Sequence, residues 1–280
     1  VPVLGFWYWA ANQYITQRVL GARDMTNARR GAILGGALKL VPLFTMVLPG
    51  ALAVKLFPDL PNPDLVFPTL VTELLPVGVV GLVMAGLIAA IMSSIDSTLN
   101  SASTLVVCDF IQARRPELTG DDVGRYGRIT TLVLMVVAAV WAPMIAEMGG
   151  LFEYLQQAFA IVVPPVAAIF MLGALTKKGS ARTALLTLVI GHALGLGVFI
   201  LGQLGHWPLH FTINAGLMTA VSVGLYLALA AGDPIREANL QAVWTKADAT
   251  PHHGGGALGD YRWQSVAVLG LTVAMVLAFW

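Results

Sequence analysis

Polar side chains cluster in this chain where an apolar helix would be expected to continue. The segment Gly81 to Met92 is entirely apolar. It is followed directly by hydroxyl, amide and carboxylate side chains: Ser93, Ser94, Asp96, Ser97, Asn100, Ser101, Ser103 and Thr104. Acyl chains cannot hydrogen-bond such groups, so a polar helix face of this size in a membrane must look onto protein or water. Faces of this kind usually mark the path of an ion or a polar solute.

The composition of the 280-residue chain is that of a membrane protein. Hydrophobic residues make up 57% of the chain and charged residues 11%, against roughly 25% charged residues in an average soluble domain. We therefore expect an all-α integral membrane protein in contact with the lipid bilayer. The net charge of +1 argues against nucleic acid as a partner, because phosphate binding needs clustered Lys and Arg. The single cysteine, Cys108, excludes an internal disulfide and a multi-cysteine metal site.

Hydropathy predicts about eight transmembrane helices. Each is an apolar stretch of about 20 residues or more, the length that crosses a hydrocarbon core of roughly 30 Å. The expected spans are 1–17, 31–57, 74–110, 126–147, 152–175, 182–204, 211–231 and 263–280. The third span is longer than one crossing, so we expect it to bend or to protrude into the cytoplasm.

The joints between these spans alternate in charge. Fourteen of the 16 basic residues fall in every second joint: Arg18, Arg23, Arg29, Arg30, Arg114, Arg115, Arg125, Arg128, Lys177, Lys178, Arg182, Arg236, Lys246 and Arg262. The opposite joints are acidic and contain only one basic residue, Lys55. Because basic loops stay in the cytoplasm, we expect a multi-pass protein of the plasma (inner) membrane with the C-terminal Trp280 outside.

Lys39 is a basic residue inside a span. It lies eight positions beyond the expected start of the second span. A Lys near the middle of a bilayer costs about 2.5 to 3.5 kcal/mol on insertion scales, so it should face a partner or an aqueous cavity. The alternative is a Lys that snorkels to the cytoplasmic interface.

Four ordered motifs resemble the sodium:solute symporter family, and most closely its sodium/glucose (sodium/galactose) cotransporter branch. The first two are Tyr8-Trp9-x-x-Asn12-Gln13-x-x-x-Gln17-Arg18 and Lys39-Leu40-x-Pro42-x-Phe44-x-Met46-Val47-x-Pro49-Gly50. The other two are Phe67-Pro68-Thr69-Leu70-Val71-x-Glu73-Leu74 and the run from Ser93-Ser94 through Asn100-Ser101-Ala102-Ser103-Thr104 to Asp109.

The resemblance implies two inverted repeats of five helices with broken helices at the binding sites. It places the second repeat, with its first helix truncated at the start, in residues 1–175. Accessory transmembrane helices would follow in 176–231, a cytoplasmic linker in 232–262 and the last transmembrane helix in 263–280. Because residue 1 is Val and not Met, we interpret the chain as a fragment whose missing N-terminal half would complete the sites.

The resemblance also implies a site for Na⁺, the transported coupling ion. Its ligands in this chain would be the carbonyl of Ala90 and the hydroxyls of Ser93 and Ser94, with Asp96 and Ser97 as further candidates. Hard cations prefer several oxygen ligands, which hydroxyls and helix carbonyls provide. Intramembrane serines can instead bond back to carbonyls one turn earlier. Asp96 could help sodium leave, form a second cation site, or anchor a basic residue from the missing half.

For the solute, the resemblance points to Tyr8, Lys39 and Gln156, with Trp9 beside the gating tyrosine. An aromatic face, an ammonium group and an amide suit a neutral polyol. Gln156 precedes Pro164-Pro165, a pair expected to break or kink its helix. Gly5 departs from the family pattern, because sugar-binding members carry a polar residue at that position. This departure leaves the identity of the solute open.

The sequence therefore predicts a secondary active transporter that couples inward sodium movement to uptake of a hexose sugar by alternating access. The alternatives are a sodium symporter for another organic solute, such as myo-inositol, a carboxylate or an amino acid, and a transporter-like sensor module. We do not expect an enzyme, because none of the five His residues pairs with an intramembrane Asp or Glu in a hydrolase or metal-ligand spacing.

Overall fold

The computed structural model describes residues 2–146, 151–235, 243–245 and 261–279. Within these ranges every regular element is a helix, which confirms the expected all-α fold. Most of the expected cytoplasmic linker 232–262 and the C-terminal Trp280 lie outside the described residues.

Among the described residues, six helices are long and apolar enough to cross a membrane. They match six of the expected spans and are Met25–Leu56, Val77–Gln112, Gly120–Ile145, Leu151–Leu175, Ala181–Gln203 and Phe211–Ala230. The last expected span is a shorter apolar helix, Tyr261–Leu277. The first expected span is divided at Asn12, between the helical segments α1 (Pro2–Phe6) and η1 (Trp7–Ala11) before it and α2 (Gln13–Leu20) after it.

Two helices begin several residues earlier than hydropathy predicts, because polar caps satisfy their first turns. The carboxylate of Asp24 accepts a hydrogen bond of 2.8 Å from the Asn27 N–H at the start of α3 (Met25–Leu38). At the start of α7 (Gly120–Ala146), the Thr119 hydroxyl accepts from the Asp122 N–H at 3.3 Å, and the Asp122 carboxylate accepts from the Thr119 N–H at 3.2 Å. Reciprocal bonds of this kind are a capping box, which stabilises a helix start regardless of its hydropathy.

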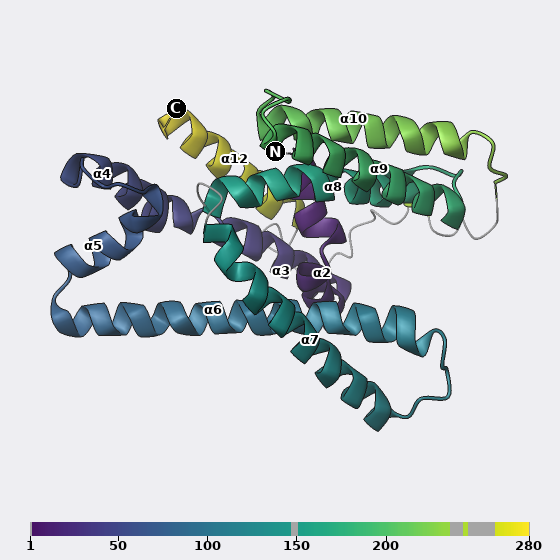
Figure 1. Ribbon diagram of the computed structural model, residues 1–280, viewed down its shortest axis with the longest axis horizontal. Helices are drawn as coiled ribbons and strands as arrows, with labels where there is room; N and C mark the ends of the chain where they lie inside the picture. The colour runs from purple at the N-terminus through teal and green to yellow at the C-terminus, as the bar shows by residue number, and fades with distance from the viewer. Residues whose placement is uncertain (1, 147–150, 236–242, 246–260, 280) are drawn as a thin grey trace. The chain divides into compact units, whose positions relative to one another are not determined.

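The chain forms two compact units. The first comprises Val1–Thr16 and Leu151–Pro251. In it, α8 (Leu151–Leu175), α9 (Ala181–Gln203) and α10 (Phe211–Ala230) pack side by side (Figure 1). The helical segments α1 and η1 lie against α8, where the ring centroids of Trp7 and Phe159 are 5.5 Å apart.

Small side chains allow α8 and α9 to approach closely. The buried residues of α9 recur at every fourth position, namely Thr183, Thr187, Gly191 and Gly195. A Cβ on Gly191 would lie 2.8 Å from Cγ of Pro165, and a Cβ on Gly195 would lie 2.5 Å from Cγ2 of Ile161. Small residues commonly form such contacts in membranes, where close packing and not the hydrophobic effect holds helices together.

The proline pair does not interrupt α8, which continues from Leu151 to Leu175. Pro164 and Pro165 are fully buried, and the ring of Pro165 fills the space that Gly191 leaves open. Each proline removes one intrahelical hydrogen bond. The Pro165 ring in turn lies directly against α9 at Gly191.

The second unit comprises Gln17–Gly150 and His252–Trp280. Its longest element is α6 (Val77–Leu105), which continues into the π-helical η4 (Val106–Gln112) and packs on α7 (Figure 1). The helix α12 (Tyr261–Phe279) packs on α3, and the Arg29 guanidinium lies 4.8 Å from the ring centroid of Tyr261. The remaining elements are η2 (Leu43–Val47), α4 (Leu48–Leu56), η3 (Pro63–Leu65) and α5 (Val66–Leu74).

The α8–α9 contact can be tested with a matched pair of glycines on α9. Gly191→Ala should lower the midpoint temperature of thermal unfolding, because the added methyl group overlaps the rigid ring of Pro165, and overpacking costs about 1 to 3 kcal/mol. Gly197→Ala is the control, since a Cβ there meets no atom within 4 Å. Thermal unfolding of both variants in detergent is the measurement, and equal midpoints would contradict the packing described.

Candidate ion and solute site

The candidate cation ligands form one stripe in the middle of α6. Ala90, Ser93, Ser94 and Ser97 follow the spacing that places side chains on one helix face. Ser94 lies seventeen residues after Val77 and eighteen before Gln112, the ends of the continuous helix. That helix has 36 residues, so it is about 54 Å long and exceeds a hydrocarbon core of about 30 Å.

Most hydroxyls of the polar run on α6 are already hydrogen-bonded to their own helix. Four of them donate to the carbonyl one turn earlier, at 2.8 to 2.9 Å, and Ser103 donates to the Asn100 carbonyl at 3.1 Å. The four are Ser97, Thr98, Ser101 and Thr104. These five residues behave as intramembrane hydroxyls without a ligand usually do.

Ser93 and Ser94 differ from the rest of the run. Their hydroxyls make no hydrogen bond to any residue that the structure describes, and both side chains are exposed on the surface of the unit. Two adjacent hydroxyls without an internal partner leave their oxygens available to an external ligand. The carbonyl of Ala90 lies one turn before Ser94, and a helix carbonyl keeps a second lone pair after its backbone bond is made.

Arg18 reaches the same stripe from α2, a contact that the sequence did not reveal. Its guanidinium donates a hydrogen bond of 2.8 Å to the Ser97 hydroxyl, which in turn donates to the Ser93 carbonyl at 2.9 Å. The Ser97 oxygen is therefore engaged both as acceptor and as donor. A cation that used Ser97 as a ligand would compete with Arg18 for this oxygen.

Asp96 lies outside the stripe. It is separated from Ser94 by two residues, or about 200° around the helix. The carboxylate is exposed and has no hydrogen bond to a residue in the described part of the chain. Asp96 also lies three residues after Ser93, or about 60° around the helix, so it flanks the stripe on the Ser93 side.

Lys39 lies at a break in its helix. Its N–H bonds to the carbonyls of Gly35 and Gly36 at 3.2 Å, where α3 ends. Pro42 follows and cannot donate a backbone hydrogen bond, and the chain continues as the π-helical η2. Lys39 is nine residues beyond Arg30, which is about 14 Å along a helix. If Arg30 marks the membrane interface, Lys39 lies near the middle of the bilayer.

Tyr8, Trp9 and Gln156 belong to the other unit. Tyr8 is half-buried on η1, and its ring contacts Trp9 edge-on, with centroids 5.5 Å apart. The contact between Trp7 and Phe159 holds η1 against α8, three residues from Gln156. The Gln156 amide is half-buried and has no hydrogen bond to a described residue. This unit therefore offers an aromatic ring and an unused amide on two neighbouring elements.

Three π-helical stretches coincide with the sequence motifs. They are Trp7–Ala11, Leu43–Val47 and Val106–Gln112. The wider turn of a π-helix leaves backbone groups imperfectly paired, and such bulges occur frequently at functional sites. Two of the three contain or closely follow candidate solute ligands, Tyr8 and Lys39.

No group of three His, Cys, Asp or Glu side chains in the described ranges is arranged to hold a metal ion. A cation at the serine pair would instead be held by neutral hydroxyl and carbonyl oxygens. Such ligands suit a transported ion, which must be held weakly. They do not suit a transition metal, which prefers imidazole or thiolate groups.

Comparison with known proteins points to one family. The model of the sodium:solute symporter family matches residues 2–191. The chain is 38% identical to sodium/myo-inositol cotransporter 2 of Sus scrofa over 215 residues, which are 70% of this chain and 32% of that protein. It is 36% identical to sodium/glucose cotransporter 4 of Homo sapiens over 215 residues, again 70% and 32% of the two chains. The chain thus spans about a third of the length of the curated relatives it matches.

Thiol labelling can test whether the serine pair faces water. In a Cys108→Ala background, Ser94→Cys should react faster with a membrane-impermeant cationic methanethiosulfonate than Met92→Cys, because thiolates form only where water reaches them. Met92 is 66% exposed and lies about 200° around α6 from Ser94, where lipid is expected. Equal labelling rates at the two positions would contradict a water-filled path along the Ser94 face.

Proposed function

Because this chain belongs to the sodium:solute symporter family, we propose that it forms part of a secondary active transporter that couples inward sodium movement to uptake of a small polar solute. The observation that carries the proposal is the pair of hydroxyls on Ser93 and Ser94 in the middle of a long apolar helix, which make no hydrogen bond to the residues that the structure describes. In lipid such groups require a partner, and a sodium ion that has lost its water would supply one.

Sodium would be held by the Ala90 carbonyl and the two hydroxyls of Ser93 and Ser94. These oxygens are neutral, so the ion is attracted without being trapped by a full opposite charge. Three ligands are fewer than a hard cation usually takes. The remaining oxygens would come from the N-terminal half that we expect to complete the site. Asp96 is proposed as a second cation site or as an exit for the ion toward the cytoplasm.

The solute would be a neutral polyhydroxylated ring, either a hexose such as glucose or galactose or the cyclic polyol myo-inositol. Relatives of both kinds match this chain, named for myo-inositol and for glucose. Tyr8 and Trp9 would contact the ring, while Lys39 and Gln156 would hydrogen-bond its hydroxyls. A Cβ on Gly5 would meet no atom within 4 Å, so this chain offers open space where sugar-binding members of the family carry a polar side chain.

A carboxylate or amino acid solute is the second candidate. Lys39 favours it, because an ammonium group exposed at a helix break in the middle of a span attracts an anion as well as a hydroxyl. A hexose or myo-inositol should then fail to compete for uptake.

The energy available from sodium is sufficient for strong accumulation. One charge that crosses a potential of about 100 mV releases about 2.3 kcal/mol, and a tenfold sodium gradient adds about 1.4 kcal/mol. The total of about 3.7 kcal/mol supports a solute gradient of roughly 500-fold. A second sodium ion would square this ratio. If Asp96 binds that second ion, it has a large effect on the solute gradient.

The charge of the joints supports the proposed topology, a multi-pass protein of the plasma (inner) membrane with its C-terminus outside. Arg29 near the start of α3 contacts Tyr261 at the start of α12, so these two helix starts lie at the same level. Both belong to joints that are expected to be cytoplasmic. The division into a second inverted repeat (1–175), accessory helices (176–231), a linker (232–262) and a last helix (263–280) remains part of the proposal.

The test is uptake of radiolabelled galactose and myo-inositol by the complete gene product in liposomes, with sodium or potassium outside. Uptake should require sodium. Ser94→Ala should raise the sodium concentration for half-maximal uptake on the order of ten- to a hundredfold, the effect of losing one bond to a charged group. Gln156→Ala and Lys39→Ala should reduce uptake. Thr104→Ala is the control, because its hydroxyl is bonded to Asn100. Equal uptake in both salts would refute sodium coupling.

Asp96→Asn tests the second cation site. The variant keeps the size of the side chain but removes its charge, so it should lower the apparent sodium affinity and the number of sodium ions moved per solute. Sodium and solute fluxes measured in the same liposomes give this ratio. An unchanged sodium dependence would indicate that Asp96 has only a structural role.

A further inference from the structure

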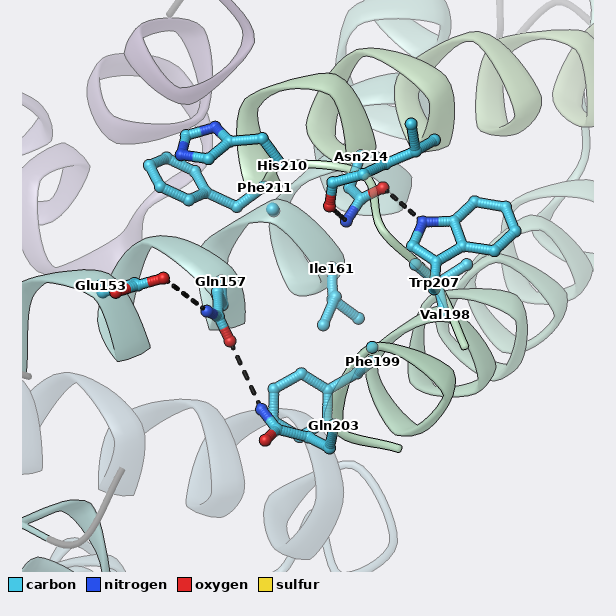
Figure 2. Close-up of a pocket in the computed structure, with 13 residues that line it drawn as sticks. Glu153, Gln157, Ile161, Val198, Phe199, Gln203, Trp207, His210, Phe211 and Asn214 are labelled. Atoms are coloured by element: carbon cyan, nitrogen blue, oxygen red, sulfur yellow. Dashed lines mark hydrogen bonds between the residues drawn. The ribbon is translucent and has the colours of Figure 1, made fainter. Parts of the chain in front are cut away.

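The first unit contains a cavity that the proposed transport site does not use. Its volume is about 230 Å³, and it lies where the first turns of α8 and α10 meet the last turns of α9 and the segment 204–210 (Figure 2). Cavities for drug-sized ligands span about 300 to 1,000 Å³. This cavity therefore fits a smaller molecule.

One wall of the cavity is a chain of hydrogen-bonding side chains (Figure 2). The Gln203 amide donates to Gln157 at 3.4 Å, and the Gln157 amide donates to the Glu153 carboxylate at 3.3 Å. Both bonds are longer than the usual value of about 2.9 to 3.0 Å, so a ligand can replace them at little cost. Two side-chain oxygens, the second carboxylate oxygen of Glu153 and the amide oxygen of Gln203, have no hydrogen-bond partner among the described residues.

The opposite wall is rigid. The Trp207 indole N–H donates to the Asn214 side-chain oxygen at 2.8 Å, and the Asn214 amide donates to the Leu209 carbonyl at 3.2 Å (Figure 2). These bonds fix the segment 204–210, which turns at Gly205 with a φ of 73°. The rings of His210 and Phe211 have centroids 4.0 Å apart. The cavity thus combines fixed aromatic rings with adaptable polar groups.

The charge and polarity of the lining narrow the class of ligand. Among the described residues that line the cavity, Glu153 is the one acidic residue and none is Lys or Arg, so phosphates and carboxylates are disfavoured. A simple alkylammonium ion brings donors only and would leave the amide N–H groups of Gln157 and Gln203 unpaired, which is costly. A hydroxyl group both donates and accepts, so it matches carboxylate and amide groups together.

We propose that this cavity is a second binding site, selective for a neutral polyhydroxylated molecule of monosaccharide or cyclitol size. Glu153, Gln157 and Gln203 bind its hydroxyls, and Trp207 and Phe211 contact its C–H faces. The site is separate from the one that contains Gln156. Gln156 does not line the cavity, and it lies about 100° around α8 from Gln157. Binding here does not depend on sodium.

The test is equilibrium binding of myo-inositol and of galactose to the purified complete gene product, in potassium chloride without sodium. It is carried out in a Gln156→Ala background, which removes the amide of the proposed transport site. Saturable binding should remain and should weaken roughly three- to tenfold in Gln157→Leu and in Gln203→Leu, since each loses a neutral hydrogen bond. Gln112→Leu is the matched control outside the cavity and should bind as the background does.

Two results would overturn the proposal. One is that neither polyol binds in the Gln156→Ala background, and the other is that ethylammonium, which offers donors only, binds more tightly than both polyols. Gln203 is exposed, so the Gln203→Leu variant should fold even if the Gln157→Leu variant does not. Unchanged polyol binding in a folded Gln203→Leu variant would also contradict the site. Sodium-independent uptake would refute the proposed sodium coupling but would not change polyol binding in this cavity. The two proposals can therefore be refuted independently.

Discussion

The structure depends on the requirement that polar groups inside a membrane find partners within the protein or from a ligand. On α6 this requirement is met residue by residue. Five hydroxyls in the polar run bond to carbonyls of their own helix. Ser93 and Ser94 do not, although they belong to the same helix and have the same chemistry. The proposed coupling ion is the group that would satisfy this pair.

The two units carry different structural features. In the first unit, glycine and proline bring α8 and α9 into close contact, and Gly191 and Pro165 fit each other. In the second unit, α3 ends before Lys39, and the chain passes Pro42, which has no N–H to donate, before it continues as η2.

Much of the fold followed from hydropathy, because apolar length is a direct consequence of membrane thickness. The starts of α3 and α7 could not be predicted in this way, since their first turns are polar and are stabilised by Asp24 and by the Thr119 and Asp122 pair. The break at Asn12 was also missed, because hydropathy assigned this residue to the continuous span 1–17. The serine pair could be identified from its motif. The contact from Arg18 to Ser97 joins residues 79 positions apart, and no local pattern indicates it. Glu153 and Gln157 do share a helix face at a spacing of four, a signal that could have pointed to the cavity.

The hydrogen bond from Arg18 to Ser97 also bears on how quickly an ion departs. It places a permanent positive charge within about one helical turn of the serine oxygens, or roughly 6 Å. Repulsion between two unit charges at that separation is about 0.7 to 3 kcal/mol for an effective dielectric constant between 80 and 20. For the proposed sodium ion, such a penalty would shorten the residence time by roughly 3- to 150-fold. A carrier that must unload in every cycle benefits from a neighbour that opposes its cargo.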